Sequence, residues 1–115
     1  MTEKELRKKA ISEVYQTLGG KAFSGVVVWS APRVKYSMEQ DIFGVFDLVC
    51  ITPENNAVIF IQFTTVKHFS EHKQKIVLWL NKHNIYDFPC WLWGYNELKG
   101  YWKKEVVSIP ERNIV

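Results

Sequence analysis

The spacing of apolar and polar positions along the chain predicts two helices. Apolar residues recur at helical spacing in residues 2–18, and Thr2 with Glu5 three positions later forms a capping box at the start of this segment. A second helix is expected from about Val66 or Ser70 to His83. Its apolar stripe consists of Phe69, Ile76, Val77 and Leu80.

Five further segments have the composition and alternation of β-strands. They are residues 23–29, 42–51, 57–64, 89–95 and 101–108. A turn at 53–56 joins the second and third segments into a hairpin, and the second helix connects the third strand to a parallel fourth. The α-β-β-β-α-β-β order predicts an α/β domain with a mixed central sheet and flanking helices.

Length and composition favour one folded domain over residues 1–115. With 47% hydrophobic residues, the 115-residue chain can build a core without disulfide or metal staples. The charged start carries no apolar leader segment, and no apolar run approaches the roughly 20 residues that cross a membrane. We therefore expect a soluble protein of the cytoplasm. Cys50 and Cys90 lie in apolar runs and are expected to be buried thiols.

Charge is concentrated in one segment of the chain. The formal net charge is only +3, but residues 66–83 contain a single acid, Glu71. The basic side chains of this segment are Lys67, His68, His72, Lys73, Lys75, Lys82 and His83. One element therefore presents a positive face, which is compatible with a polyanionic partner.

Polar residues interrupt the strands that should be most apolar. Gln62 and Thr64 point to the same side of their strand, because side chains alternate with period two. Asp41 and Asp47 share a face if their strand is unbroken. A buried carboxylate is costly unless it is paired or bound to a metal. Two interpretations stay open: these side chains converge on a functional face, or Asp47 caps or hydrogen-bonds locally while Gln62 satisfies a neighbouring backbone group.

The order of these segments resembles a known nuclease family. The segments are DIFGVFDLVCI, AVIFIQFTT after a short turn, the basic helix SEHKQKI, and then WLWGY and GYWKKEVV. From Glu13 to about Val107 this succession is similar to the PD-(D/E)XK nucleases, above all to archaeal Holliday-junction resolvases and their phage or viral relatives. The resemblance implies a restriction-endonuclease-like core and a Mg²⁺- or Mn²⁺-dependent endonuclease that cleaves branched or structured DNA. It also implies a homodimer, because a junction presents two equivalent cleavage points.

The resemblance assigns roles to individual positions. Asp47 stands at the metal-binding aspartate, and Gln62 stands at the second ligand position, where glutamate is commoner. Thr64 occupies the usual place of the catalytic lysine and cannot supply a cation. A relocated lysine is expected in the second helix, where Lys73 falls inside the apolar arc and Lys75 lies next in line.

Assisting roles follow from the same resemblance. Glu13 is the acid expected from the first helix, although it could equally be an ordinary boundary residue. Asp41 either assists at the metal or caps the entry to its strand. The basic residues expected to contact DNA are Arg33, Lys35, Lys67, His68 and His72. Aromatic residues from Trp91 to Trp102 are expected in the core or at a dimer surface, with base stacking as the other interpretation.

The departures at Gln62 and Thr64 leave two other functions open. One is a nuclease-fold protein with weak or no catalysis that binds DNA. The other is an interaction domain in which the polar strand residues only satisfy one another.

Overall fold

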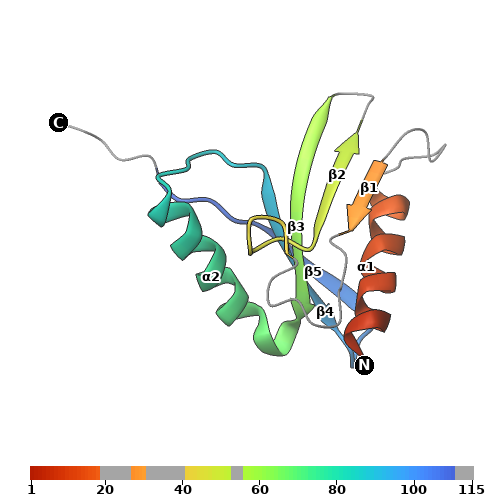
Figure 1. Ribbon diagram of the computed structural model, residues 1–115. Helices are drawn as coiled ribbons and strands as arrows, with labels where there is room; N and C mark the ends of the chain where they lie inside the picture. Colours follow the sequence, from red (N-terminus) through yellow and green to blue (C-terminus); the bar gives the residue numbers. More distant parts are fainter. Residues whose placement is uncertain (19–26, 31–40, 53–55, 111–115) are drawn as a thin grey trace, which may run out of the picture.

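One five-stranded mixed sheet with a helix on each face forms the framework of the computed structural model (Figure 1). The structure describes residues 1–18, 27–30, 41–52 and 56–110. Its elements are α1 (Glu3–Thr17), β1 (Val27–Ser30), β2 (Leu48–Thr52), β3 (Ala57–Thr65), the short 3₁₀-helix η2 (Val66–His68), α2 (Phe69–Lys82), β4 (Cys90–Asn96) and β5 (Tyr101–Val106). The predicted α/β class with a mixed sheet and two helices is confirmed.

The strands follow one another in sequence order across the sheet. β1, β2 and β3 form an antiparallel meander, β4 lies parallel to β3, and β5 returns antiparallel to β4. The predicted β2–β3 hairpin is confirmed, and so is the parallel β3–β4 pair that α2 connects. The first predicted strand is described only from Val27, so its residues 23–26 lie outside the described part of the chain.

The helix α1 covers one face of the sheet. The Thr2 hydroxyl accepts a hydrogen bond from the Glu5 backbone N–H at 3.2 Å, which is the predicted cap. Leu6, Ala10 and Val14 are buried against side chains of β2, β3 and β4. No helix within the described residues is long and apolar enough to span a membrane.

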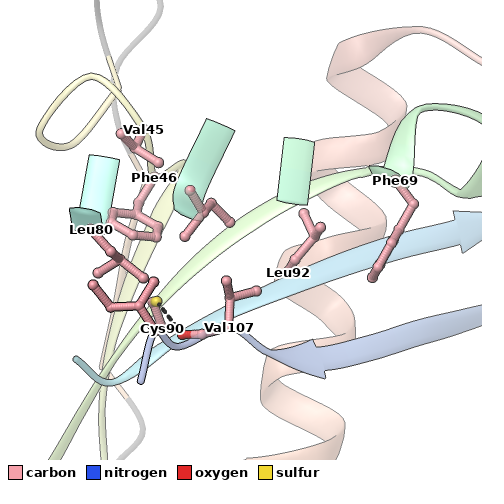
Figure 2. Packing of buried hydrophobic residues seen from close by; sticks show 9 residues of the cluster. Val45, Phe46, Phe69, Leu80, Cys90, Leu92 and Val107 are labelled. Carbon is pink, nitrogen blue, oxygen red and sulfur yellow. Dashed lines mark hydrogen bonds between the residues drawn. The ribbon is translucent and has the colours of Figure 1, made fainter. Parts of the chain in front are cut away.

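The helix α2 covers the other face, where Phe69, Ile76 and Leu80 pack on Cys90 and Leu92 of β4 (Figure 2). The predicted apolar stripe of the second helix is therefore confirmed at these three positions. Both cysteines are buried and free, as predicted. Burial raises the pKa of the Cys50 thiol to about 12 and that of Cys90 to about 11. These thiols stay protonated near neutral pH and are not reactive nucleophiles.

The prediction of one strand over residues 42–51 is wrong in its first half. Residues 42–46 form a tight turn closed by Ile42 N–H donating to Phe46 O at 2.7 Å, and β2 begins only at Leu48. Phe43 and Gly44 adopt positive φ angles of 56° and 71°. Glycine tolerates that conformation, whereas a phenylalanine there costs about 1–3 kcal/mol. The face shared by Asp41 and Asp47 therefore cannot come from strand alternation.

A close approach between β4 and α2 gives a first testable prediction. A Cβ placed on Gly94 would lie 2.5 Å from Cδ2 of Phe69, whose side chain is 4% exposed. Because the ring is held in the core, Gly94→Ala should lower the free energy of unfolding by about 1–3 kcal/mol. Urea denaturation of both proteins measures the change, and an unchanged midpoint would contradict this packing.

Candidate functional site

A polar pocket of about 300 Å³ lies where the start of α1, the turn before β2, the end of β3 and the start of α2 meet. Its lining contains residues that the sequence analysis singled out: Asp41, Asp47, Gln62, Thr64, His72 and Lys75. We call this cavity the polar pocket. The turn at 42–46 carries the chain from Asp41 to Asp47, so a turn, not a strand, brings the two carboxylates to one cavity.

Asp47 is fixed to the backbone of β3. Its side chain is 5% exposed, and Oδ2 accepts a hydrogen bond from the Phe63 N–H at 3.0 Å. Its own N–H donates to Ile61 O at 2.9 Å. Asp47 therefore does satisfy a backbone group, but one on β3 and not one that is local in the chain, and the same residue lines the polar pocket. The expectation that Gln62 satisfies a backbone group is wrong, because its side chain bonds to the His72 ring.

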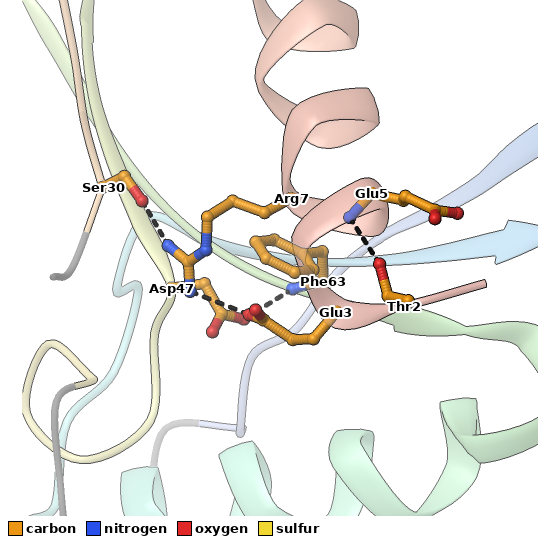
Figure 3. A network of polar contacts seen from close by, with 7 residues as sticks. All are labelled: Thr2, Glu3, Glu5, Arg7, Ser30, Asp47 and Phe63. Atoms are coloured by element: carbon orange, nitrogen blue, oxygen red, sulfur yellow. Dashed lines mark hydrogen bonds and ion pairs between the residues drawn. The ribbon is translucent and has the colours of Figure 1, made fainter. Parts of the chain in front are cut away.

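Residues of α1 extend this arrangement into a polar network. Arg7 Nη2 donates to Glu3 Oε1 at 3.0 Å, and Arg7 Nη1 donates to the Ser30 hydroxyl. Figure 3 shows Glu3, Arg7, Ser30 and Asp47 drawn together as one network. An arginine close to a buried aspartate offsets part of the cost of burying its charge. Arg7 could not be singled out from the sequence, because a basic residue beside the apolar stripe of a helix carries no signal of its partner.

Gln62 holds the most unusual polar atom of the pocket. Its side chain is 2% exposed, and Nε2 hydrogen-bonds to His72 Nδ1 at 2.8 Å. Its Oε1 is buried and has no hydrogen-bond partner among the described residues. A buried carbonyl oxygen left unpaired costs about 1–3 kcal/mol. The polar pocket therefore offers one amide oxygen that a ligand could satisfy.

His72 accepts the Gln62 hydrogen bond in its neutral form, and its surroundings favour that form. Desolvation lowers the pKa of His72 below its usual 6.5, the positive charges of Lys75 and His68 lower it further, and the carboxylates of Glu71 and Asp41 act in the opposite direction. Neutral imidazole keeps one ring nitrogen as an acceptor. The Gln62 side chain is thereby held with its amide NH₂ toward α2.

The shifted pKa of His72 predicts a pH dependence of stability. Below pH 6.5 the unfolded chain binds a proton at His72 while the folded chain does not, so stability falls as the pH falls from 6.5 toward the lower folded pKa. His72→Gln should remove this part of the dependence. Urea unfolding at several pH values between neutrality and pH 5 measures it for both proteins. Identical pH profiles would contradict the assignment.

The two candidate lysines of α2 have different surroundings. Lys75 lines the polar pocket, whereas the Lys73 ammonium pairs with the Glu105 carboxylate of β5 and its side chain is 45% exposed. The prediction that Lys73 faces the core is wrong. The helical wheel predicts only the direction in which Lys73 points from the helix axis. It does not show that the Glu105 carboxylate of the edge strand β5 lies within reach of that side chain at the surface.

Glu13 is not brought to the polar pocket. Its carboxylate pairs with Lys104 of β5 at 2.7 Å, far along α1 from the residues that line the cavity. The acid that α1 contributes to the lining is Glu3. Both glutamates lie near the apolar arc of the helix, so the wheel alone cannot tell which end of α1 meets the site.

The basic residues expected at DNA fall into three groups. His68 and His72 line the polar pocket, and His68 Nδ1 also lies 3.6 Å from Glu71 Oε2. Lys67 lines a different cavity, beside Tyr95 and Glu97. Arg33 and Lys35 lie outside the described residues. Thr64 is 6% exposed and lines the polar pocket with Gln62, which confirms that the two share a face.

Three aromatic residues of β4 and β5, Trp93, Tyr95 and Trp102, form a chain of ring contacts. Trp93 is 2% exposed, and its ring centroid lies 5.9 Å from that of Trp102, which in turn lies 5.0 Å from that of Tyr95. The expectation of core packing is confirmed for Trp93.

Comparison of the chain with protein-family models, with curated proteins and with solved structures finds no match. The site's chemistry must therefore be argued from its own residues. Among the described residues, no group of three or more His, Cys, Asp or Glu side chains is placed to hold a metal ion. A metal site in the polar pocket would therefore combine one or two carboxylates with the Gln62 amide oxygen.

Proposed function

We propose that the chain is a metal-dependent endonuclease of the PD-(D/E)XK, resolvase-like class that hydrolyses phosphodiester bonds in DNA. The observation that carries the proposal is the buried Gln62 Oε1, which has no hydrogen-bond partner among the described residues and belongs to a pocket lined by Asp47 and Lys75. The succession helix, strand, Asp47 strand, Gln62-x-Thr64 strand and helix supports the same class, because it is the order on which the sequence resemblance rests.

The donor set of the polar pocket fits a hard cation. Mg²⁺ prefers oxygen ligands and is commonly held by one or two carboxylates together with water and substrate phosphate. Asp47 and Gln62 would supply a carboxylate and an amide oxygen, and Asp41 a further carboxylate. A bound Mg²⁺ or Mn²⁺ would lower the pKa of an attacking water and neutralise charge on the phosphate. With Gln62 in place of a glutamate, the site carries one negative charge less and should bind the cation more weakly.

The chain's own residues then have separable roles. Lys75 presents an ammonium at the pocket, where it would stabilise the negative charge that develops on the phosphate as water adds and the strand oxygen leaves. His72 holds the Gln62 amide by its NH₂, which leaves Oε1 available. The Phe63 N–H orients the carboxylate of Asp47. Lys75 thereby replaces the lysine that is missing at Thr64.

The proposal is tested by incubating the protein with a labelled four-way junction and with a duplex of matching sequence, in Mg²⁺, Mn²⁺ or EDTA. We expect metal-dependent cutting that EDTA abolishes, with the junction cut faster than the duplex. A folded protein that cuts neither DNA in either metal would overturn the proposal for these substrates. Analytical ultracentrifugation of the same samples tests the homodimer that junction cleavage requires.

A DNA-binding protein with weak or no catalysis is the second candidate function. It is favoured by the amide at Gln62 and by Thr64 in place of a lysine, since both changes remove charge from the site. Binding of the junction in EDTA without cutting in either metal would support it. In that case the affinity should fall steeply with salt, because phosphate contacts release counterions.

A further inference from the structure

The turn between Asp41 and Asp47, two residues that line the polar pocket, carries an exposed aromatic ring that packs on the partly buried ring of Trp79. Phe43 is 61% exposed at the tip of the turn between Asp41 and Asp47. Its ring stacks on that of Trp79 of α2, with centroids 5.8 Å apart and planes inclined by 23°. The turn is held by three further hydrogen bonds, from Gly44 N–H to Asp41 O at 2.9 Å and from the Val45 and Phe46 N–H groups to Ile42 O at 3.0 and 2.9 Å. A rigid turn therefore presents an aromatic ring to solvent beside two pocket carboxylates.

Phe43 is exposed although its backbone conformation is strained. Its φ of 56° is unfavourable for a bulky residue, and the chain adopts it at a position where 61% of the residue is exposed. Strained residues of this kind concentrate at binding and catalytic sites. The strained backbone at Phe43 therefore indicates that its exposed ring binds a ligand.

Lys75 and Lys82 place positive charge on the side of α2 that carries Trp79, whereas the lowered pKa of His72 favours its neutral form. His72, Lys75, Trp79 and Lys82 fall within an arc of about 80° on α2 at 100° per residue. Glu71 is the one acid in the sequence of α2; it lies about 20° beyond this arc, beside Lys82, and its carboxylate is 3.6 Å from His68. The imidazole of His83 extends the aromatic surface, with its centroid 5.5 Å from that of Trp79. A basic stripe with an aromatic centre suits a polyanion that also has flat apolar faces.

We propose that Phe43 and Trp79 form a stacking site for an unpaired nucleobase of a DNA strand whose phosphate lies in the polar pocket. This inference rests on the proposed function and names its substrate class, which is DNA with an unpaired base next to the cleaved bond. Lys75 lines the pocket, and Trp79 follows four residues later, about 6 Å along the helix axis. That distance is within two steps of a nucleic-acid strand at about 3.4 Å each. A base one or two positions from the bound phosphate can therefore reach the rings.

The inference is tested with a short single-stranded oligonucleotide that contains one 2-aminopurine, whose fluorescence is quenched when the base stacks. Binding is measured in EDTA, so that no strand is cut. We expect quenching by the wild-type protein and by Phe43→Trp, which keeps a ring. Phe43→Leu keeps an apolar side chain but has no ring, so it should lose the quenching and bind about tenfold more weakly. The control Leu98→Ala, at a side chain that is 99% exposed, should behave as wild type.

The outcomes separate this inference from the proposed function. Equal quenching and affinity for wild type and Phe43→Leu, or no binding by the wild type, overturns the stacking site. Junction cleavage by the same preparations is scored independently. Cutting without stacking removes only the inference, whereas stacking without cutting removes the nuclease and leaves the stacking site on a DNA-binding protein. The slope of affinity against salt should be unchanged in Phe43→Leu, because that ring contacts no phosphate.

Discussion

Lys75→Met should reduce metal-dependent DNA cleavage by about 100-fold or more, whereas Lys73→Met should leave it close to the wild-type rate. The first lysine lines the polar pocket, and the second pairs with Glu105 outside it. Loss of a group that stabilises charge in the transition state of an enzyme commonly costs about 100- to 1000-fold. Methionine keeps an unbranched side chain that is one atom shorter and removes the charged ammonium group. Initial cleavage rates on a labelled junction, at saturating metal, measure both variants.

The two lysines are a matched pair for this comparison. They lie on the same helix, both are exposed, and both substitutions remove one positive charge from the protein. A general loss of attraction between protein and DNA would therefore slow both variants alike. Equal rates for Lys75→Met and wild type, or a larger loss in Lys73→Met, would contradict the role given to Lys75.

Phe46→Ala should lower the free energy of unfolding by about 3–5 kcal/mol, the cost typical of removing a buried phenylalanine. Phe46 is fully buried, and its ring centroid lies within 5.7 Å of those of Phe60, Trp79 and Phe88. Its deletion leaves a cavity under the turn that leads to Asp47. The measurement is urea unfolding followed by circular dichroism.

Phe43→Ala is the matched control for this loss of stability. Phe43 belongs to the same turn and also contacts Phe60 and Trp79, but it is 61% exposed. Its truncation should therefore cost much less stability than that of Phe46. If the two substitutions destabilised the protein equally, the assignment of Phe46 to the core and of Phe43 to the surface would be wrong.

The elements of the fold could be predicted from the sequence where periodicity is strong. The apolar stripe that includes Phe69, Ile76 and Leu80 predicted α2, and the capping residue Thr2 predicted the start of α1. The apolar run before Asp47 did not reveal its turn, because the residues of this turn other than Gly44 are as apolar as those of a buried strand. Gly44 was the only local sign that the strand could break there.

The candidate site could be predicted where it depends on periodicity within one element. Gln62 and Thr64 share a face because successive side chains of a strand point to opposite sides of the sheet, whatever the strand packs against. The positions of Lys73 and Glu13 depend instead on where each helix lies along the sheet, which a helical wheel does not contain. The pairing of Gln62 with His72 joins residues on two elements, and no spacing rule within one element predicts it.

The most direct test of the central claim is cleavage of a four-way junction by Asp47→Asn in Mg²⁺, beside wild type and Glu13→Gln. Asparagine can still accept the Phe63 N–H, so the variant should fold, and its thermal unfolding is checked first. The account predicts that Asp47→Asn loses the cutting and that Glu13→Gln, outside the polar pocket, retains it. Full metal-dependent cutting by folded Asp47→Asn would contradict a nuclease centred on this pocket.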